Sequence, residues 1–188
     1  SATGYTEGVD KAQFDFDASY ASITGSRSKY HDRTFQQSLD YNIDAIKDLD
    51  LLIGGLYYYD KLYNTQKWPA AGGDIVGNQA FGLSAAGFGL TAITKNQQIT
   101  KSWAIYIDAT YHVNDRVALT AGGRYSHDTK SYLLISRNPS NVITLGPLAK
   151  SVTWTKFTPR VNVRYELAPK TNIYAGWQRG TRNGNFNG

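Results

Sequence analysis

The chain alternates between apolar and polar residues over several stretches, most clearly from Arg116 to Tyr125. Val117 and Leu119 occupy odd positions there, whereas Thr120 and Arg124 occupy even ones. Successive side chains of a β-strand point to opposite faces, so this stretch predicts a strand with one apolar and one polar side.

The same odd-numbered parity recurs near residues 39–43, 103–111 and 161–167. We therefore predict an all-β fold, an antiparallel up-and-down meander of about eight strands in a curved sheet whose first and last strands do not meet. The predicted strands lie near residues 5–15, 20–29, 36–46, 51–62, 99–113, 116–132, 152–167 and 172–180.

The connections between these strands are of two kinds. The stretches 47–50, 114–116 and 168–171 are short and rich in Asn, Asp, Pro and Lys, as hairpin turns are. The stretches 64–98 and 128–150 are predicted to be long loops. Short turns at one end and long loops at the other are typical of outer-membrane barrels.

Composition excludes membrane-spanning helices. The most apolar run, residues 49–59, is interrupted by Asp50, Gly54 and Gly55, and the mean hydropathy of the chain is −0.44. A spanning helix needs about 20 apolar residues, but a spanning strand needs about 9–11 with only every second one apolar. The chain begins at Ser1 with no signal peptide, and we expect it to be an internal fragment of a longer protein.

Charge and candidate chemistry exclude several other functions. The net charge of +5 is scattered along the chain, so no nucleic-acid partner is expected. There is no cysteine, and His31, His112 and His127 lack metal-ligand spacing. No nucleophile motif is present, so we predict no enzymatic activity, no metal and no cofactor.

Seven segments follow one another along the chain: Ser22–Gly25, Gly54–Tyr58, Ala104–His112, Asp115–Tyr125, Phe157–Val161, Asn172–Ala175 and Arg179-Gly180. Taken in this order, they resemble the barrel of TonB-dependent receptors. The resemblance covers roughly residues 14–62 and 99–188. After Arg179-Gly180 the family pattern continues with an apolar residue, Lys and Gly-Gly-Phe, whereas this chain reads Thr-Arg-Asn-Gly-Asn-Phe, which leaves the subfamily open.

The resemblance implies a transmembrane barrel of about 22 strands filled by a plug. It also implies a TonB energy-transducing complex as partner, acting through the plug region. Because no plug segment is found in the chain, residues 1–188 are expected to be a partial barrel domain, about a third of the barrel. The implied function is energy-dependent uptake of a ferric siderophore, vitamin or oligosaccharide across the bacterial outer membrane.

Two other functions stay open. One is a passive outer-membrane channel or small membrane barrel, which would need first and last strands that pair and close. The other is a soluble β-barrel that binds a small ligand, which would need the apolar side to point inward. On the receptor interpretation the long loops face outside the cell and help to capture the substrate.

Parity predicts which side chains meet lipid and which line the lumen. The lipid-facing residues are expected to be Leu39, Ile43, Ile105, Ile107, Leu119, Val161 and Val163. The polar wall of the lumen is expected to contain Asp108, Arg124, Asn162, Arg164 and Glu166. An aromatic girdle at the membrane interfaces is expected from Tyr57, Tyr59, Trp103, Tyr111, Tyr125, Tyr165 and Trp177. The ligand-contact residues are not predicted.

Overall fold

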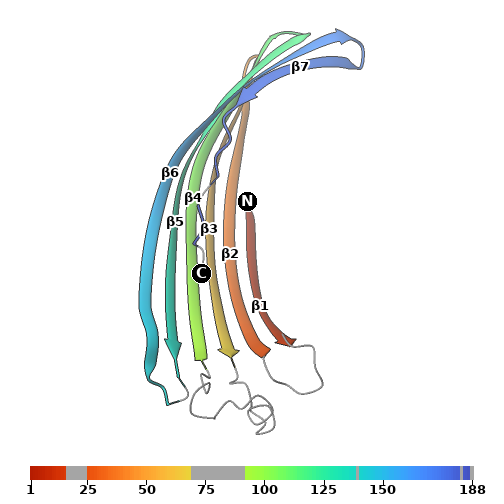
Figure 1. Cartoon of the computed structure of the whole chain (residues 1–188). Coiled ribbons are helices and arrows are strands. Elements are labelled where there is room, and N and C mark those ends of the chain that lie inside the picture. Colours follow the sequence, from red (N-terminus) through yellow and green to blue (C-terminus); the bar gives the residue numbers. More distant parts are fainter. Residues whose placement is uncertain (16–24, 69–91, 139, 183, 187–188) are drawn as a thin grey trace.

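A computed structural model describes residues 1–15, 25–68, 92–138, 140–182 and 184–186, which form one curved sheet of seven strands (Figure 1). The strands lie side by side in chain order, and every neighbouring pair is antiparallel. The first and last strands do not pair with each other, so the predicted open meander is confirmed. The strands are β1 Ala2–Asp15, β2 Gly25–Ile46, β3 Leu49–Trp68, β4 Ala92–Asn114, β5 Val117–Arg137, β6 Ile143–Ala168 and β7 Thr171–Gln178.

Two-residue turns join β2 to β3, β4 to β5 and β6 to β7 at one end of the sheet, called here the turn end. Asp48 and Lys170 adopt left-handed φ angles of 58° and 68°, a conformation that Asp tolerates better than most residues. In the middle turn, Asn114 Oδ1 accepts hydrogen bonds from the backbone N–H groups of Arg116 and Val117, both at 2.9 Å. The three short connections are therefore where the sequence predicted them.

The opposite end of the sheet, called here the loop end, holds the other three connections. Residues 16–24 and 69–91 are outside the described part of the chain. The connection from β5 to β6 is only 138–142, where the Val142 N–H donates to Asn138 Oδ1 at 2.9 Å. Residues 64–68, 92–98, 128–137 and 143–150 are paired strand rather than loop, so the two predicted long loops were drawn too wide.

The structure describes seven strands where about eight were predicted. Residues 25–46 form one strand, whereas two strands were predicted at 20–29 and 36–46. Between them, residues 30–35 pair with β1 and β3 through the backbone although both faces carry polar side chains. The alternation of apolar and polar residues is lost there because neither face is apolar, while the hydrogen-bonded ladder continues.

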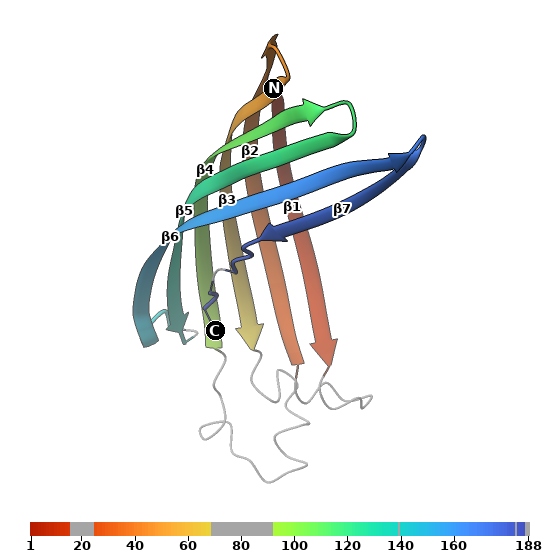
Figure 2. The ribbon, with the colours of Figure 1, turned by 90° about the horizontal axis from the view of Figure 1, so that it is seen from above.

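The described sheet is a single layer (Figure 2), and almost none of its side chains are buried. Among the described residues, the only buried hydrophobic side chains are those of Ala104 and Ala118. A water-soluble domain packs at least two layers around a core, and no second layer covers either face of the described sheet. No helix long and apolar enough to cross a membrane occurs in the described residues.

Candidate functional site: a polar wall opposite an apolar band

The strand register sorts the side chains of the sheet onto two faces. In all six pairings, odd-numbered residues lie opposite odd-numbered residues, except at the pair that closes each two-residue turn and at a register shift near Ser136. All odd-numbered side chains therefore share one side of the sheet, called here the odd face, and the even-numbered ones share the even face. An odd or even residue number in these strands thus tells on which face of the sheet the side chain lies.

The odd face carries an uninterrupted apolar band next to the turn end. It consists of the odd positions of 39–43, 49–57, 103–111, 117–125, 157–165 and 173–177, and no charged residue is among them. On β3 to β6 the band is nine residues long, which matches the roughly 9–11 residues of a membrane-spanning strand. Leu39 is 61% exposed and Ile105 60%, so no layer of the described residues covers these large side chains. All seven residues predicted to face lipid belong to this band.

Aromatic side chains mark both margins of the apolar band. Toward the loop end, Tyr57 lies opposite Trp103, whose ring centroid is 5.7 Å from that of Tyr125 and 5.4 Å from that of His127. The ring of Phe35, which the sequence analysis did not include, is 6.3 Å from Tyr57.

The other predicted girdle residues are less uniform in position. Tyr111 and Tyr165 lie near the turn end, and Tyr59 lies two residues beyond Tyr57, opposite Lys101. Trp177 lies opposite Val161 inside the band rather than at its margin. The girdle itself therefore remains a prediction for six of the seven residues, and Trp177 fits it least.

The even face is polar, and its centre contains an ion pair that joins β4 to β6. The guanidinium Nε of Arg160 donates to Asp108 Oδ1 at 2.6 Å, across the intervening strand β5. The contact passes over Gly122, where an added Cβ would lie 1.7 Å from Asp108 Oδ1. The absence of a side chain at Gly122 is therefore what allows the two charged groups to meet.

A second bridge of the same design joins β4 to β2. The Tyr106 hydroxyl donates to Asp40 Oδ1 across β3, and its ring lies over Gly54. A Cβ at Gly54 would come within 2.4 Å of that ring. At both Gly54 and Gly122 the missing side chain therefore leaves room for a bridge across the middle strand.

The five predicted wall residues all lie on the even face but do not form one cluster. Asp108 and Arg124 line a hollow of about 330 Å³, whereas Asn162, Arg164 and Glu166 follow along β6 toward the turn end. Arg160, which lies on the same face, was not among the predicted wall residues. The hollow is lined, among others, by Leu56, Tyr106, Asp108, Arg124, Arg160 and Arg179.

Charge on the even face changes sign across the sheet. Carboxylates predominate on β2 to β4, at Asp32, Asp40, Asp50, Asp60 and Asp108. Basic residues predominate on β5 and β6, where they are Arg124, Lys130, Lys150, Lys156, Arg160 and Arg164. A polar partner lying against this wall would therefore meet an acidic half and a basic half.

The C-terminal segment after β7 turns back over the basic half of the wall. Lys156 Nζ donates to the backbone oxygen of Arg182 at 2.6 Å, and Lys130 Nζ donates to Asn185 Oδ1 at 3.1 Å. The Phe186 ring lies 5.7 Å from that of Tyr132. The even face is thus able to hold a peptide segment through polar and aromatic contacts.

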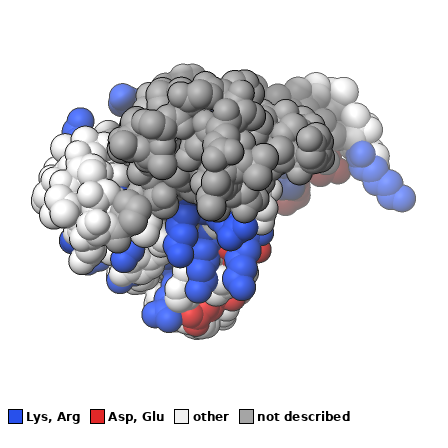
Figure 3. All heavy atoms as spheres, turned by 60° about the horizontal axis from the view of Figure 1, so that its bottom comes forward, with Lys and Arg blue, Asp and Glu red and all other residues white. Residues whose placement is uncertain are grey.

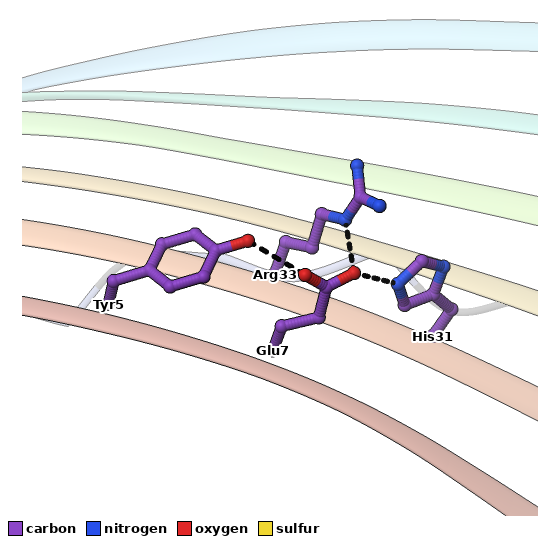
Figure 4. A network of polar contacts seen from close by, with 4 residues as sticks. All are labelled: Tyr5, Glu7, His31 and Arg33. Atoms are coloured by element: carbon purple, nitrogen blue, oxygen red, sulfur yellow. Dashed lines mark hydrogen bonds and ion pairs between the residues drawn. The ribbon is translucent and has the colours of Figure 1, made fainter.

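The odd face beyond the apolar band contains a separate polar network on β1 and β2 (Figure 4). Glu7 Oε1 lies 2.8 Å from His31 Nε2 and 2.8 Å from Arg33 Nε, and Glu7 Oε2 accepts from the Tyr5 hydroxyl at 2.9 Å. Hydrogen bonds from His31, Tyr5 and Arg33 lower the pKa of Glu7 to about 2. Glu7 is therefore ionised at neutral pH and is already engaged by its own neighbours.

No group of three or more potential metal ligands occurs among the described residues. His31 lies beside Glu7, His112 Nε2 is 2.8 Å from Asp50 Oδ2, and His127 Nδ1 is 3.2 Å from Thr155 Oγ1. Each histidine therefore has a different local partner, and the described part of the chain brings no two of them together.

Comparisons with known proteins agree with this geometry. The family model described as TonB dependent receptor-like, beta-barrel, matches residues 1–188. The ferric yersiniabactin uptake receptor FyuA from Yersinia pestis is structurally similar, with a TM-score of 0.60 and 14% identity, over 82% of this chain and 22% of that chain. The ferric citrate transporter FecA in its unliganded form gives a TM-score of 0.48 and 18% identity, over 81% of this chain and 20% of that chain. No curated protein matches the sequence.

The similarity to FyuA shows the fold. At 14% identity it does not extend to the ligand. The chain spans about a fifth of the length of these two receptors.

Proposed function

Because the chain belongs to the TonB dependent receptor-like β-barrel family, whose members are bacterial outer-membrane proteins, we propose that it forms part of the wall of a receptor for energy-dependent nutrient uptake. In this proposal the parent protein has further strands, which complete the barrel, and a plug. The plug region contacts the TonB complex, which supplies energy from the inner membrane. The substrate is a scarce small molecule of the siderophore, vitamin or oligosaccharide class.

The single observation that carries the proposal is the apolar band on the odd face. It is nine residues long on four neighbouring strands, lacks charge, and leaves large side chains such as Leu39 and Ile105 exposed. Burying such a surface in water-soluble form would need a second layer, whereas a bilayer covers it directly. We propose that Leu39, Ile43, Ile105, Ile107, Leu119, Val161 and Val163 face lipid.

The even face then lines the lumen. Its ion pair, its tyrosine bridge and its two halves of opposite charge suit a surface that meets a plug and water rather than hydrocarbon. We propose that Asp108, Arg124, Asn162, Arg164 and Glu166 belong to this wall, together with Arg160. We do not propose that these wall residues bind the substrate.

Orientation follows from the connections. Outer-membrane barrels have short turns on the periplasmic side and longer loops on the extracellular side. We propose that the turn end is periplasmic and that the stretches 64–98 and 128–150 project outward, where they help to capture the substrate.

Uptake measurements test the proposal. The natural full-length protein, expressed in outer membranes, should accumulate one of a panel of labelled ferric siderophores, vitamins or oligosaccharides. Accumulation should fall to background when an uncoupler dissipates the proton gradient, or in a strain without the TonB complex. Accumulation that persists under both treatments would instead identify a passive channel.

A further inference from the structure

The segment that follows β7 leaves the sheet partway along β6. Gln178, the last residue of β7, lies opposite Arg160, whereas β6 extends from there to Ile143 at the loop end. Beyond Arg160, no strand of the described residues lies along this edge of β6. Figures 1 and 2 show the chain leaving β7 as an irregular trace. The described residues of this segment, 179–182 and 184–186, are called here the strap.

Pro159 explains why β7 stops where it does. The Arg179 N–H donates to the Pro159 backbone oxygen at 3.1 Å. In an antiparallel ladder, the two residues of such a pair exchange two hydrogen bonds. The second bond would need an amide N–H at position 159, and proline has none. The ladder between β6 and β7 is therefore interrupted at this pair.

The strap nevertheless keeps the register of β7. Four pairs beyond Gln178, this register places Arg182 opposite Lys156, and Lys156 Nζ donates to the Arg182 backbone oxygen at 2.6 Å. Two pairs further it places Gly184 opposite Trp154, and a Cβ added to Gly184 would lie 3.2 Å from the Trp154 ring. The strap thus follows β6 residue by residue, but over its even-face side chains rather than along its edge.

Side chains of β5 and β6 hold the strap on the even face. Lys130 Nζ donates to Asn185 Oδ1 at 3.1 Å, and the Phe186 ring lies 5.7 Å from the Tyr132 ring. Lys150 Nζ lies 6.0 Å from the centre of the Phe186 ring, within cation–π range. Lys and Arg side chains also gather on the face that Figure 3 shows with the loop end turned forward. These contacts take the place of the backbone ladder that the strap gives up by leaving the edge of β6.

The edge of β6 offers the strap a second position. A strand edge presents N–H and C=O groups that can pair with another segment. Because the strap is already in register with β6, it would need only to move from the even face to this edge. Asn185 would then lie opposite Thr153, and its side chain would point to the odd face instead of toward Lys130.

We propose that the strap switches between a docked state on the even face and a paired state along the edge of β6. In the docked state it narrows the lumen beside β5 and β6. In the paired state it continues β7 as barrel wall and clears the lumen. Pro159 makes the switch possible, because the missing hydrogen bond weakens the paired state. The inference rests on the proposed function, in which the even face lines the lumen, and it makes the strap a gate for uptake.

Crosslinking in the natural full-length protein tests the two states. Lys130→Cys with Asn185→Cys reports the docked state and leaves the contacts of Lys156 and Phe186 in place. Thr153→Cys with Asn185→Cys reports the paired state, because residues directly opposite each other on neighbouring strands have Cβ atoms about 5 Å apart. A short bifunctional thiol reagent should join the first pair in the natural background.

Pro159→Thr supplies the missing N–H and should shift the ratio of the two crosslinks toward the paired state. We expect a shift of about two- to tenfold, as one added backbone hydrogen bond would give. Val161→Thr is the matched control, since it places the same side chain on the same face of β6 and adds no N–H. The control should leave the ratio unchanged.

Gly184→Val tests the switch from the docked side. Its Cβ would press on the Trp154 ring, so the ratio should again move toward the paired state. Gly180→Val is the matched control, because a Cβ there would meet nothing within 4 Å. Heat-modifiable gel mobility checks that every variant is assembled, and the Gly184 pair decides the matter if Pro159→Thr is not.

Three results would overturn the proposal. They are the absence of the docked crosslink in the natural background, the same crosslink ratio in each variant as in its control, and equal uptake by barrels locked in either state. The docked lock should lower uptake, and the paired lock should not. The crosslinks form without substrate, so a failure of energy-dependent uptake would refute the proposed function and leave the switch measurable.

Discussion

At the residue scale, Gly122 shows how a missing side chain organises the polar wall. It lets Asp108 of β4 reach Arg160 of β6 across β5. Gly54 does the same for Tyr106 and Asp40. A side-chain contact between two strands that flank a third must pass over the middle strand. It therefore needs a glycine there, because any larger residue would fill the space.

Gly122→Ala should therefore break the Asp108–Arg160 pair. The added Cβ would lie 1.7 Å from Asp108 Oδ1 and 2.8 Å from the backbone oxygen of Ile107, so side chain and strand must both shift. We expect a loss of about 1–3 kcal/mol, typical of overpacking, measured as urea unfolding of the assembled barrel. Gly55→Ala is the control, because its Cβ would be 3.7 Å from the nearest atom. Equal stability of the two variants would contradict this account of Gly122.

The assignment of faces makes a second prediction at this scale. Leu119→Arg or Val163→Arg should impair membrane insertion, because Arg on the lipid face costs about 2–4 kcal/mol at the bilayer midplane. Thr120→Arg or Asn162→Arg, on the even face of the same strands, should assemble far better. Heat-modifiable gel mobility separates folded from unfolded barrel. Equal assembly of both sets would show that the apolar band is not in lipid.

At the element scale, the hairpins depend on side chains at the turn end. Asn114 accepts two backbone hydrogen bonds, from Arg116 and Val117. We expect Asn114→Ala to destabilise the β4–β5 hairpin by about 1 kcal/mol, and Asn114→Asp, which keeps the acceptor oxygen, to be near neutral. The measurement is again the unfolding midpoint in urea. A loss in Asn114→Asp as large as that in Asn114→Ala would show that the oxygen is not what holds the turn.

The ends of the strands were predicted less accurately than their faces. The predicted break between residues 29 and 36 does not exist, and β5 runs to Arg137 rather than ending near 132. The alternation of apolar and polar residues occurs where one face of a strand contacts an apolar medium. The length of a strand depends instead on backbone hydrogen bonds to its neighbours. The two coincide in the apolar band and separate beyond it, where both faces are polar.

At the scale of the whole molecule, the described chain is a sheet with two open edges and no core. We expect the 188-residue chain by itself to stay dispersed only in detergent or lipid, because the apolar band and the edges of β1 and β7 would otherwise associate. Light scattering after refolding with and without detergent measures this. A monodisperse monomer in plain buffer would contradict the membrane assignment and favour the soluble ligand-binding barrel.

The sequence by itself determined the class of fold, the direction of pairing and the face of each strand residue. It could do so because the side-chain period of a strand is two, and because the observed registers join odd to odd across the sheet. The family was predicted from several segments that, in their order along the chain, resemble the barrel of TonB-dependent receptors.

Only the tertiary structure decided which distant residues meet. Asp108 and Arg160 are 52 positions apart, and the hollow lined by Lys11, Arg27, Lys29 and Lys67 draws on three strands. Neither has a local signal, because the residues that share a site are set by the register between strands and by the curvature of the sheet. The strands also extend well beyond the apolar band through backbone hydrogen bonds, which do not depend on the pattern of side chains.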